Sequence, residues 1–360
     1  MSKKVENVQA LRGIAILAVL LPHLKIYETR FGHGILGASP LFAVGNAGVD
    51  LFFLISGFVM VTVAGRFRGP DGAADFLYRR ATRIYPLYWF YSLLVLPLFL
   101  RHPEMVNSSD AGAHLILRKS FLLLPQQASP LVAQGWTLIH ELYFYLVFAI
   151  LLQAPARMFV PALLGWAVAV TGGALLIHSP GPSLAIVFNP VTFEFILGCF
   201  VAVAIRRGIN RRGPLFIALG TVGFVIAAAV QVSPHSAWSR VLWYGVPSGL
   251  LLYGAAAAEG RNELHMPAAL VYAGDISYSL YLSHGLVLAA LGRVWWRYLS
   301  AGAVSNLTAC LVFASIAVFF AALSNRLIER PLQSVLRHNP FIARPKGLLP
   351  QMPRTLVPAD

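Results

Sequence analysis

Residues 11–24, LRGIAILAVLLPHL, form an almost wholly apolar stretch with Arg12 near one end and His23 near the other. A helix that crosses a membrane needs about 20 mostly apolar residues, and this stretch supplies them together with its flanks. Arg12 and His23 are 11 positions apart, so in an α-helix they share nearly the same face, separated by roughly 16 Å along the axis. Ionisable groups inside a membrane are costly unless they face a cavity or a partner. The segment therefore predicts one wall of a polar path through a bilayer.

The composition of the whole chain is that of a membrane protein. Its 360 residues are 58% hydrophobic and only 12% charged, with a mean hydropathy of +0.69. A soluble domain does not carry so little charge over such a length. Apolar runs predict about ten membrane-spanning helices, so the expected fold class is all-α and polytopic. The expected spans cover approximately residues 8–27, 41–64, 84–100, 136–153, 158–178, 184–205, 214–232, 238–258, 275–292 and 303–325, with the third opening at Pro86.

The net charge of +14 bears on orientation. In a soluble protein such a charge would suggest nucleic acid as a partner. Here the basic residues follow the spans: with the N-terminus inside, 20 of the 28 Lys and Arg residues fall on the inner side. Cytoplasmic loops of membrane proteins show this bias. The pattern predicts both termini in the cytoplasm, the lipid bilayer as a partner and no nucleic acid.

The spans and their loops divide the chain into a membrane domain, residues 1–332, and a proline-rich remainder, residues 333–360. That remainder is predicted to be a disordered cytoplasmic tail. The outer segment 101–135 contains HLILRKSFLLLP, which is too short to span and is expected to lie in the interface or dip back. Cys199 and Cys310 both lie inside apolar runs. They predict neither a disulfide framework nor a metal site.

Two carboxylates fall at a depth similar to that of His23. Asp50 in GNAGVDLFFLISGF and Glu141 in GWTLIHELYFY both lie in the outer halves of expected spans. A carboxylate beside a histidine fixes its tautomer and raises its basicity, as a general base requires. His23, Asp50 and Glu141 are therefore the candidate catalytic residues, with Asp50 as the hypothetical partner of His23 and Glu141 as the rival. The glycines near Asp50 are expected to serve close helix packing.

A basic stretch, FLYRRATRIYP, precedes the third span and includes Arg80 and Arg83. These two arginines are three positions apart, about one helical turn. Guanidinium groups placed in this way can bind phosphate through paired hydrogen bonds. The stretch predicts a site for a phosphate-bearing ligand on the cytoplasmic side.

Several of these motifs together resemble a known family. LRGIAILAVLLPH with its Arg-x10-His spacing, GNAGVDLFFLISGF, FLYRRATRIYPLYW, GWTLIHELYFY, FEFILG, GDISYSLYLSHG and SNRLIERP occur in that order over about residues 6–332. In this order they resemble the acyltransferase-3 family of bacterial membrane acyltransferases. The resemblance implies a bacterial inner-membrane enzyme with about ten spans. It also implies transfer of an acyl group, usually acetyl, from cytoplasmic acetyl-CoA to a hydroxyl of an extracytoplasmic sugar in exopolysaccharide, O-antigen or a related glycan.

The resemblance also implies roles for particular residues. The Arg-x10-His pair of the family falls on Arg12 and His23, its arginine-rich stretch on Arg80 and Arg83, and its glutamate on Glu141. Arg12, Arg80 and Arg83 would then bind the phosphates of acetyl-CoA, with no metal involved. His23 would deprotonate the sugar hydroxyl or carry the acetyl group briefly. Acetyl and succinyl both remain open as the acyl group.

The chain departs from many relatives because only about 30 residues follow the last span, and none resembles the SGNH hydrolase-like domain that those relatives carry there. An alternative from another class is a transporter or flippase for a glycan or lipid-linked intermediate. The Arg-x10-His signature and the lack of visible inverted repeats favour the enzyme.

Overall fold

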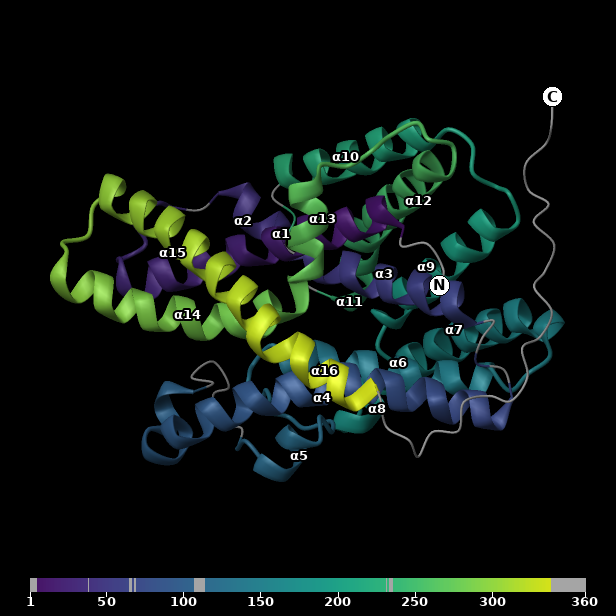
Figure 1. The fold of residues 1–360 in the computed structure, drawn as a ribbon, viewed down its shortest axis with the longest axis horizontal. Coiled ribbons are helices and arrows are strands. Elements are labelled where there is room, and N and C mark those ends of the chain that lie inside the picture. The colour runs from purple at the N-terminus through teal and green to yellow at the C-terminus, as the bar shows by residue number, and fades with distance from the viewer. Residues whose placement is uncertain are drawn as a thin grey trace.

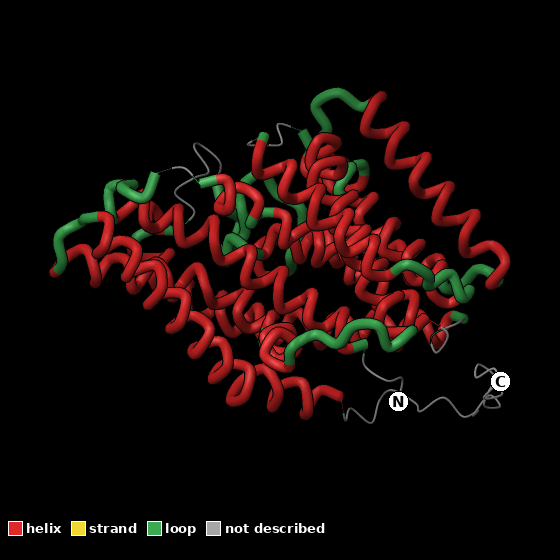
Figure 2. Tube along the Cα trace, turned by 90° about the horizontal axis from the view of Figure 1, so that it is seen from above, coloured by secondary structure: helices red, strands yellow, loops and turns green. Residues whose placement is uncertain are grey.

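The computed structural model describes residues 5–337, apart from residues 38, 65–66, 68, 107–113, 231 and 233–235. Within this part of the chain every regular element is a helix, as Figure 2 shows by its red tubes joined by green loops. The all-α expectation is therefore confirmed. Each of the ten expected spans overlaps one long helix, and the spans 41–64, 184–205 and 238–258 also include most of a shorter helix before it. The long helices are α1 (Glu6–Phe31), α3 (Ala47–Ala64), α4 (Pro70–Arg101), α6 (Gly135–Leu151), α7 (Phe159–Leu176), α9 (Thr192–Arg206), α10 (Gly213–Ala229), α12 (Val246–Gly260), α14 (Ser277–Tyr298) and α15 (Ala303–Ser324).

Shorter helices link or extend the long ones (Figure 1). They are α2 (Pro40–Val44), α5 (Leu117–Phe121), α8 (Pro182–Val187), α11 (Ala237–Arg240), α13 (Ala268–Asp275) and α16 (Arg330–Arg337). Single wider turns of π-helix join α11 to α12 at Val241–Gly245 and α15 to α16 at Asn325–Glu329. Short 3-10 turns follow α4 at Pro103–Met105 and precede α7 at Ala156–Met158.

Length and composition fit a membrane environment. Among the described residues, seven helical stretches are long and apolar enough to cross a bilayer, and α6 and α10 are shorter apolar helices of 17 residues each. α14 has 22 residues but is not one of the seven. The outward faces are apolar: Val304 and Phe319 of α15 are 80% and 70% exposed. Such faces suit hydrocarbon, where every backbone polar group must be bonded within its own helix.

The centre of the bundle is built on glycines at helix crossings. A Cβ atom added to Gly57 of α3 would lie 2.0 Å from the carbonyl oxygen of Phe195 in α9, and one added to Gly198 of α9 would lie 1.9 Å from that of Leu54 in α3. A Cβ at Gly48 would lie 2.3 Å from the carbonyl oxygen of Ala15 in α1. Glycine lets these backbones touch, as small residues do between membrane helices. The expectation of close packing near Asp50 is confirmed.

The start of the third span differs from the expectation. The helix begins at Pro70 and runs to Arg101, so Pro86 lies inside α4 and does not open it. A proline in the first turn of a helix costs no backbone hydrogen bond, because the N–H groups of that turn have no partner within the helix. In α4 the first-turn proline is Pro70. Arg80 and Arg83 therefore lie within a long helix, which holds both side chains in fixed positions along its length.

The structure also bears on two predictions for segments outside the spans, the outer segment 101–135 and the tail 333–360. In the segment 101–135, the part around α5 folds back on α4: the hydroxyl of Tyr88 donates to the carbonyl oxygen of Ser120 at 2.9 Å. At five residues α5 is too short to span, as expected. Of the predicted tail, residues 333–337 belong to α16. Residues 338–360 lie outside the described part of the chain.

Candidate functional site

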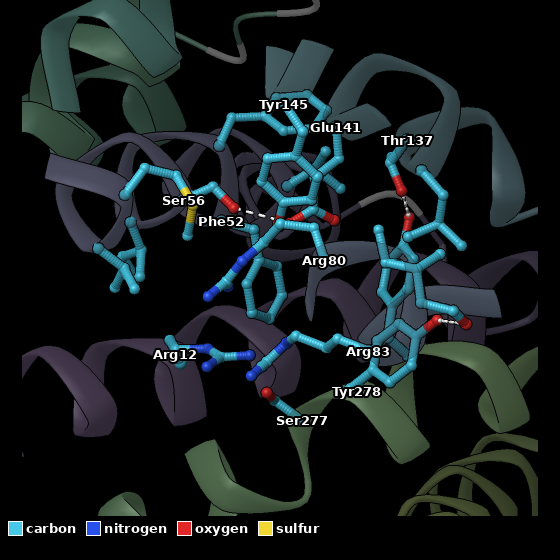
Figure 3. A pocket seen from close by; sticks show the side chains of 18 residues that line it. Arg12, Phe52, Ser56, Arg80, Arg83, Thr137, Glu141, Tyr145, Ser277 and Tyr278 are labelled. Atoms are coloured by element: carbon cyan, nitrogen blue, oxygen red, sulfur yellow. Dashed lines mark hydrogen bonds between the residues drawn. The ribbon is translucent and has the colours of Figure 1, made fainter. Parts of the chain in front are cut away.

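A pocket with about 800 Å³ of empty space, open solvent included, lies where α1, α3, α4, α6 and α14 meet. Apolar side chains of α3, among them Phe52 and Phe53, form much of its wall. Its polar lining is drawn in Figure 3, where the labelled side chains converge from these helices. The polar residues that line it are Arg12 of α1, Ser56 of α3, Arg80 and Arg83 of α4, Thr137, Glu141 and Tyr145 of α6, and Ser277, Tyr278 and Tyr281 of α14.

Three arginines from two helices point into this pocket. In Figure 3 the guanidinium groups of Arg12 and Arg83 lie close together, and that of Arg80 reaches into the same space. No ion pair joins any of the three to a carboxylate in the described part of the chain. The buried Nε of Arg80 has no hydrogen-bond partner there. Like charges so arranged repel one another, and an anion in the pocket would relieve both the repulsion and the unmet hydrogen bonds.

Glu141 lies in the same pocket and is anchored by two hydroxyl groups. The hydroxyl of Ser56 donates to Oε1 of Glu141 at 2.8 Å, and that of Tyr145 donates to the same oxygen. Tyr145 is four residues after Glu141, so both side chains project from one face of α6. The guanidinium of Arg80 lies over the Tyr145 ring, 5.9 Å from its centroid. The carboxylate thus holds the donor groups of α3 and α6 beside the arginines.

His23 is not among the residues that line the pocket, and it lies further along α1. Its Nδ1 is 2.8 Å from the carbonyl oxygen of Val19. A carbonyl only accepts, so Nδ1 carries the proton and Nε2 of the neutral ring keeps a free lone pair. The ring contacts a second imidazole, that of His284 in α14, with centroids 4.4 Å apart. His23 is partly exposed, so Nε2 is available to a ligand as a base.

Asp50 has a partner other than the expected histidine. Its side chain is fully buried, and both carboxylate oxygens accept from Arg240 of α11, at 2.8 Å from Nε and 2.7 Å from Nη2. A two-pronged guanidinium–carboxylate pair of this kind is strong and directional. Asp50 is therefore placed to hold α3 against α11. The hypothesis that Asp50 orients His23 finds no contact in the structure, and its rival Glu141 is held by Ser56 and Tyr145.

The structure adds residues that the sequence did not single out as a site. Tyr278 joins the pocket and donates to the carbonyl oxygen of Ile84 at 2.7 Å, which fixes α14 against α4. The hydroxyl of Tyr281 is 2.7 Å from that of Thr137. The four-residue spacing from Glu141 could have indicated Tyr145 from the sequence. The contact of α14 with α4 could not have been predicted in this way, because the two helices are far apart in the chain. Among the described residues, no group of three or more His, Cys, Asp or Glu side chains could hold a metal ion.

Comparison with known proteins identifies the family. A family model described as an acyltransferase domain matches residues 5–325. The exopolysaccharide production protein ExoZ of Rhizobium meliloti (strain 1021) is 26% identical, with 81% of this chain and 90% of ExoZ covered. The acyltransferase MdmB of Streptomyces mycarofaciens is 26% identical over 98% of this chain and 97% of MdmB. Nodulation protein 10 of Rhizobium leguminosarum bv. viciae is 26% identical over 79% and 81%.

No solved structure matches this chain. The family model covers nearly the whole described bundle, including α1, the arginines of α4 and the pocket between them. The chain belongs to the acyltransferase-3 family of membrane acyltransferases.

Proposed function

We propose that the protein is an O-acyltransferase of the bacterial inner membrane, which moves an acetyl group from cytoplasmic acetyl-CoA to a hydroxyl of an extracytoplasmic sugar. The observation that carries the proposal is a group of three arginines, Arg12, Arg80 and Arg83, in one pocket with an apolar wall. None of the three forms an ion pair with a carboxylate among the described residues. Coenzyme A has phosphates at its nucleotide end and a long flexible arm that ends in the thioester. The arginines suit the phosphates, and the apolar wall suits the arm.

The pocket also lies close to His23. Tyr281 lines the pocket, and its ring centroid is 6.1 Å from that of His284, which in turn contacts the His23 ring. Arg12 and His23 share α1, at opposite ends of a path of roughly 16 Å. A donor bound by its phosphates at Arg12 could therefore present its thioester near His23.

In the proposed reaction His23 acts as the general base. Its free Nε2 takes the proton of the acceptor hydroxyl while the hydroxyl oxygen attacks the thioester carbonyl carbon. The new C–O bond forms, the C–S bond breaks, and the proton passes from His23 to the departing thiolate. Glu141 offsets part of the positive charge in the pocket and keeps Ser56 and Tyr145 in place.

The acceptor is proposed to be a surface glycan. ExoZ is named for exopolysaccharide production and the second Rhizobium relative for nodulation, which supports an exopolysaccharide or a related glycan as the acceptor class. MdmB is named as an acyltransferase. Acetyl and succinyl groups differ in charge, so one pocket should not accept both equally well. Comparing the transfer of label to glycan from labelled acetyl-CoA and from labelled succinyl-CoA identifies the acyl group.

The test uses inverted membrane vesicles supplied with acetyl-CoA labelled on the acetyl group. Glycan should gain label with the wild-type protein. His23→Ala should lower kcat by about 10²- to 10⁴-fold, the usual contribution of a general base, with little change in KM for acetyl-CoA. Arg83→Gln should do the reverse and raise KM by roughly 10- to 100-fold, as expected when a charge-assisted hydrogen bond is lost.

Arg157→Gln is the matched control, because Arg157 is an exposed arginine outside the pocket, on the same predicted side of the membrane. It should leave both constants unchanged. Normal labelling by His23→Ala would remove histidine 23 from the reaction. Transport of unlabelled glycan without acetylation would favour a flippase instead.

A further inference from the structure

A second imidazole lies against His23 and has no function in the mechanism above. His284 of α14 is fully buried. Its Nδ1 is 3.0 Å from the carbonyl oxygen of Leu280, and because a carbonyl only accepts, that nitrogen carries the proton. Nε2 is then a bare acceptor, and it has no hydrogen-bond partner among the described residues. Two independent observations, the ring contact and the unpartnered nitrogen, therefore single out this residue.

The two histidines are arranged alike. Each donates from Nδ1 to the carbonyl oxygen four residues earlier in its own helix, so each leaves Nε2 as its basic nitrogen. Their centroids are 4.4 Å apart and the ring planes meet at 84°, an edge-to-face contact. Such a contact sets the edge of one imidazole against the face of the other.

The surroundings leave His23 as the titratable group that contacts His284 most closely. The helices packed on α14 also bring Tyr27 of α1 and Tyr91 of α4 nearby, but Tyr27 donates to the carbonyl oxygen of Gly285 and Tyr91 bonds to the hydroxyl of Ser324. Tyr281 of α14 itself bonds to Thr137. No carboxylate among the described residues forms a hydrogen bond or ion pair with His284.

Burying an imidazole whose acceptor nitrogen has no hydrogen bond costs free energy, because that nitrogen loses its hydrogen bond to water. A phenylalanine ring would give similar packing without that cost. The nitrogen therefore needs a chemical reason, and the neighbouring ring supplies one. When His23 takes up a proton it becomes a cation in a low-dielectric region. The unpartnered acceptor nitrogen of the adjacent His284 ring can stabilise that cation, and a phenylalanine ring has no such nitrogen.

We propose that His284 is a positioning residue that stabilises the imidazolium formed on His23 during acyl transfer. The inference rests on the proposed function, because it needs His23 to accept the hydroxyl proton. The O–H bond of the acceptor breaks, the N–H bond forms at Nε2 of His23, and His284 stays neutral beside the new cation. Two imidazolium ions in ring contact would repel each other, so the proton stays on one ring until the thiolate takes it.

The test compares His284→Phe with His140→Phe in the same labelled-acetyl assay. Phenylalanine keeps a ring at position 284 and removes both nitrogens. His140 is the matched control, a buried histidine of α6 packed against Phe53 and Trp136 and not in contact with His23. His284→Phe should lower kcat by roughly 10- to 100-fold and leave KM for acetyl-CoA unchanged. The acidic limb of its pH–rate profile should move to lower pH, because protonated His23 is less stable without the acceptor nitrogen of His284.

Each outcome decides the proposal. Wild-type kcat and an unmoved profile in His284→Phe would overturn it, and so would an equal loss in His140→Phe, which would indicate packing alone. Recovery of most of the rate by His284→Asn, a smaller side chain that keeps a polar group, would support it. If the wild-type protein itself transfers no label, the proposed function fails and this inference with it. An active wild type with an active His284→Phe contradicts only the role of His284.

Discussion

At the scale of single residues, the most informative contact is the pair between Asp50 and Arg240. The sequence placed Asp50 at the depth of His23, and depth alone made a pairing with the histidine reasonable. Depth does not say which way a side chain points around its helix. Both oxygens of Asp50 face Arg240 of α11, and this pair is buried on the carboxylate side.

Asp50→Asn should therefore destabilise the protein, because it removes the carboxylate that accepts hydrogen bonds from both Nε and Nη2 of Arg240. Breaking one partner of a buried pair costs about 3 kcal/mol or more. The measurement is the apparent thermal unfolding midpoint of the protein in detergent, for Asp50→Asn, Arg240→Gln and the double variant. The double variant should lose less than the sum of the two single changes. Strict additivity would show that the two residues do not depend on each other.

At the scale of helices, the crossing of α3 with α9 decides where the pocket wall lies. Ser56 comes directly before Gly57, which touches α9, so the position of the Ser56 hydroxyl depends on this crossing. The sequence indicated close packing from small residues, but it did not identify α9 as the partner. Partner choice depends on which surfaces fit together, and that information is spread over residues far apart in the chain.

Gly198→Ala should push α3 and α9 apart, since the added Cβ would lie 1.9 Å from a backbone oxygen that cannot rotate away. We expect a lower unfolding midpoint, and a loss of acyl transfer because Ser56 and Glu141 no longer meet. Gly165→Ala is the control, because a Cβ on that glycine of α7 would have no atom of the described residues within 4 Å. It should be neutral or slightly stabilising, as alanine favours helix over glycine. Equal effects of the two changes would contradict the role of the crossing.

At the scale of the whole molecule, the orientation in the membrane determines which substrate reaches which end of α1. The distribution of basic residues predicts that the pocket arginines face the cytoplasm. α3 is the most enclosed of the spans and α7 and α15 are peripheral, with 72%, 17% and 28% of their apolar windows buried. Of the helices that supply the pocket, α3 is central, α1 is half-buried, and α4 has only 33% of its apolar window buried.

Single cysteines can test this orientation in intact cells with a membrane-impermeant maleimide. Ser183→Cys, exposed before α9, should react because the expected topology places it outside. Ile209→Cys, 57% exposed after α9, should react only after the membrane is opened. The native Cys199 and Cys310 are both buried and serve as background. The reverse labelling pattern would place the arginine pocket on the outer side and remove cytoplasmic acetyl-CoA as its ligand.

The all-α class and the approximate places of ten apolar helices follow from local sequence, because hydropathy and helical period are properties that short stretches encode. Arg12, Arg80 and Arg83 were predicted from local sequence as well, as residues that bind phosphate. It also indicated His23 as a base, from its place in an apolar helix. Packing between distant helices brings Glu141 to Ser56, Asp50 to Arg240, and His284 to His23. These pairings depend on how helices far apart in the chain rotate and pack, and no local pattern specifies that rotation.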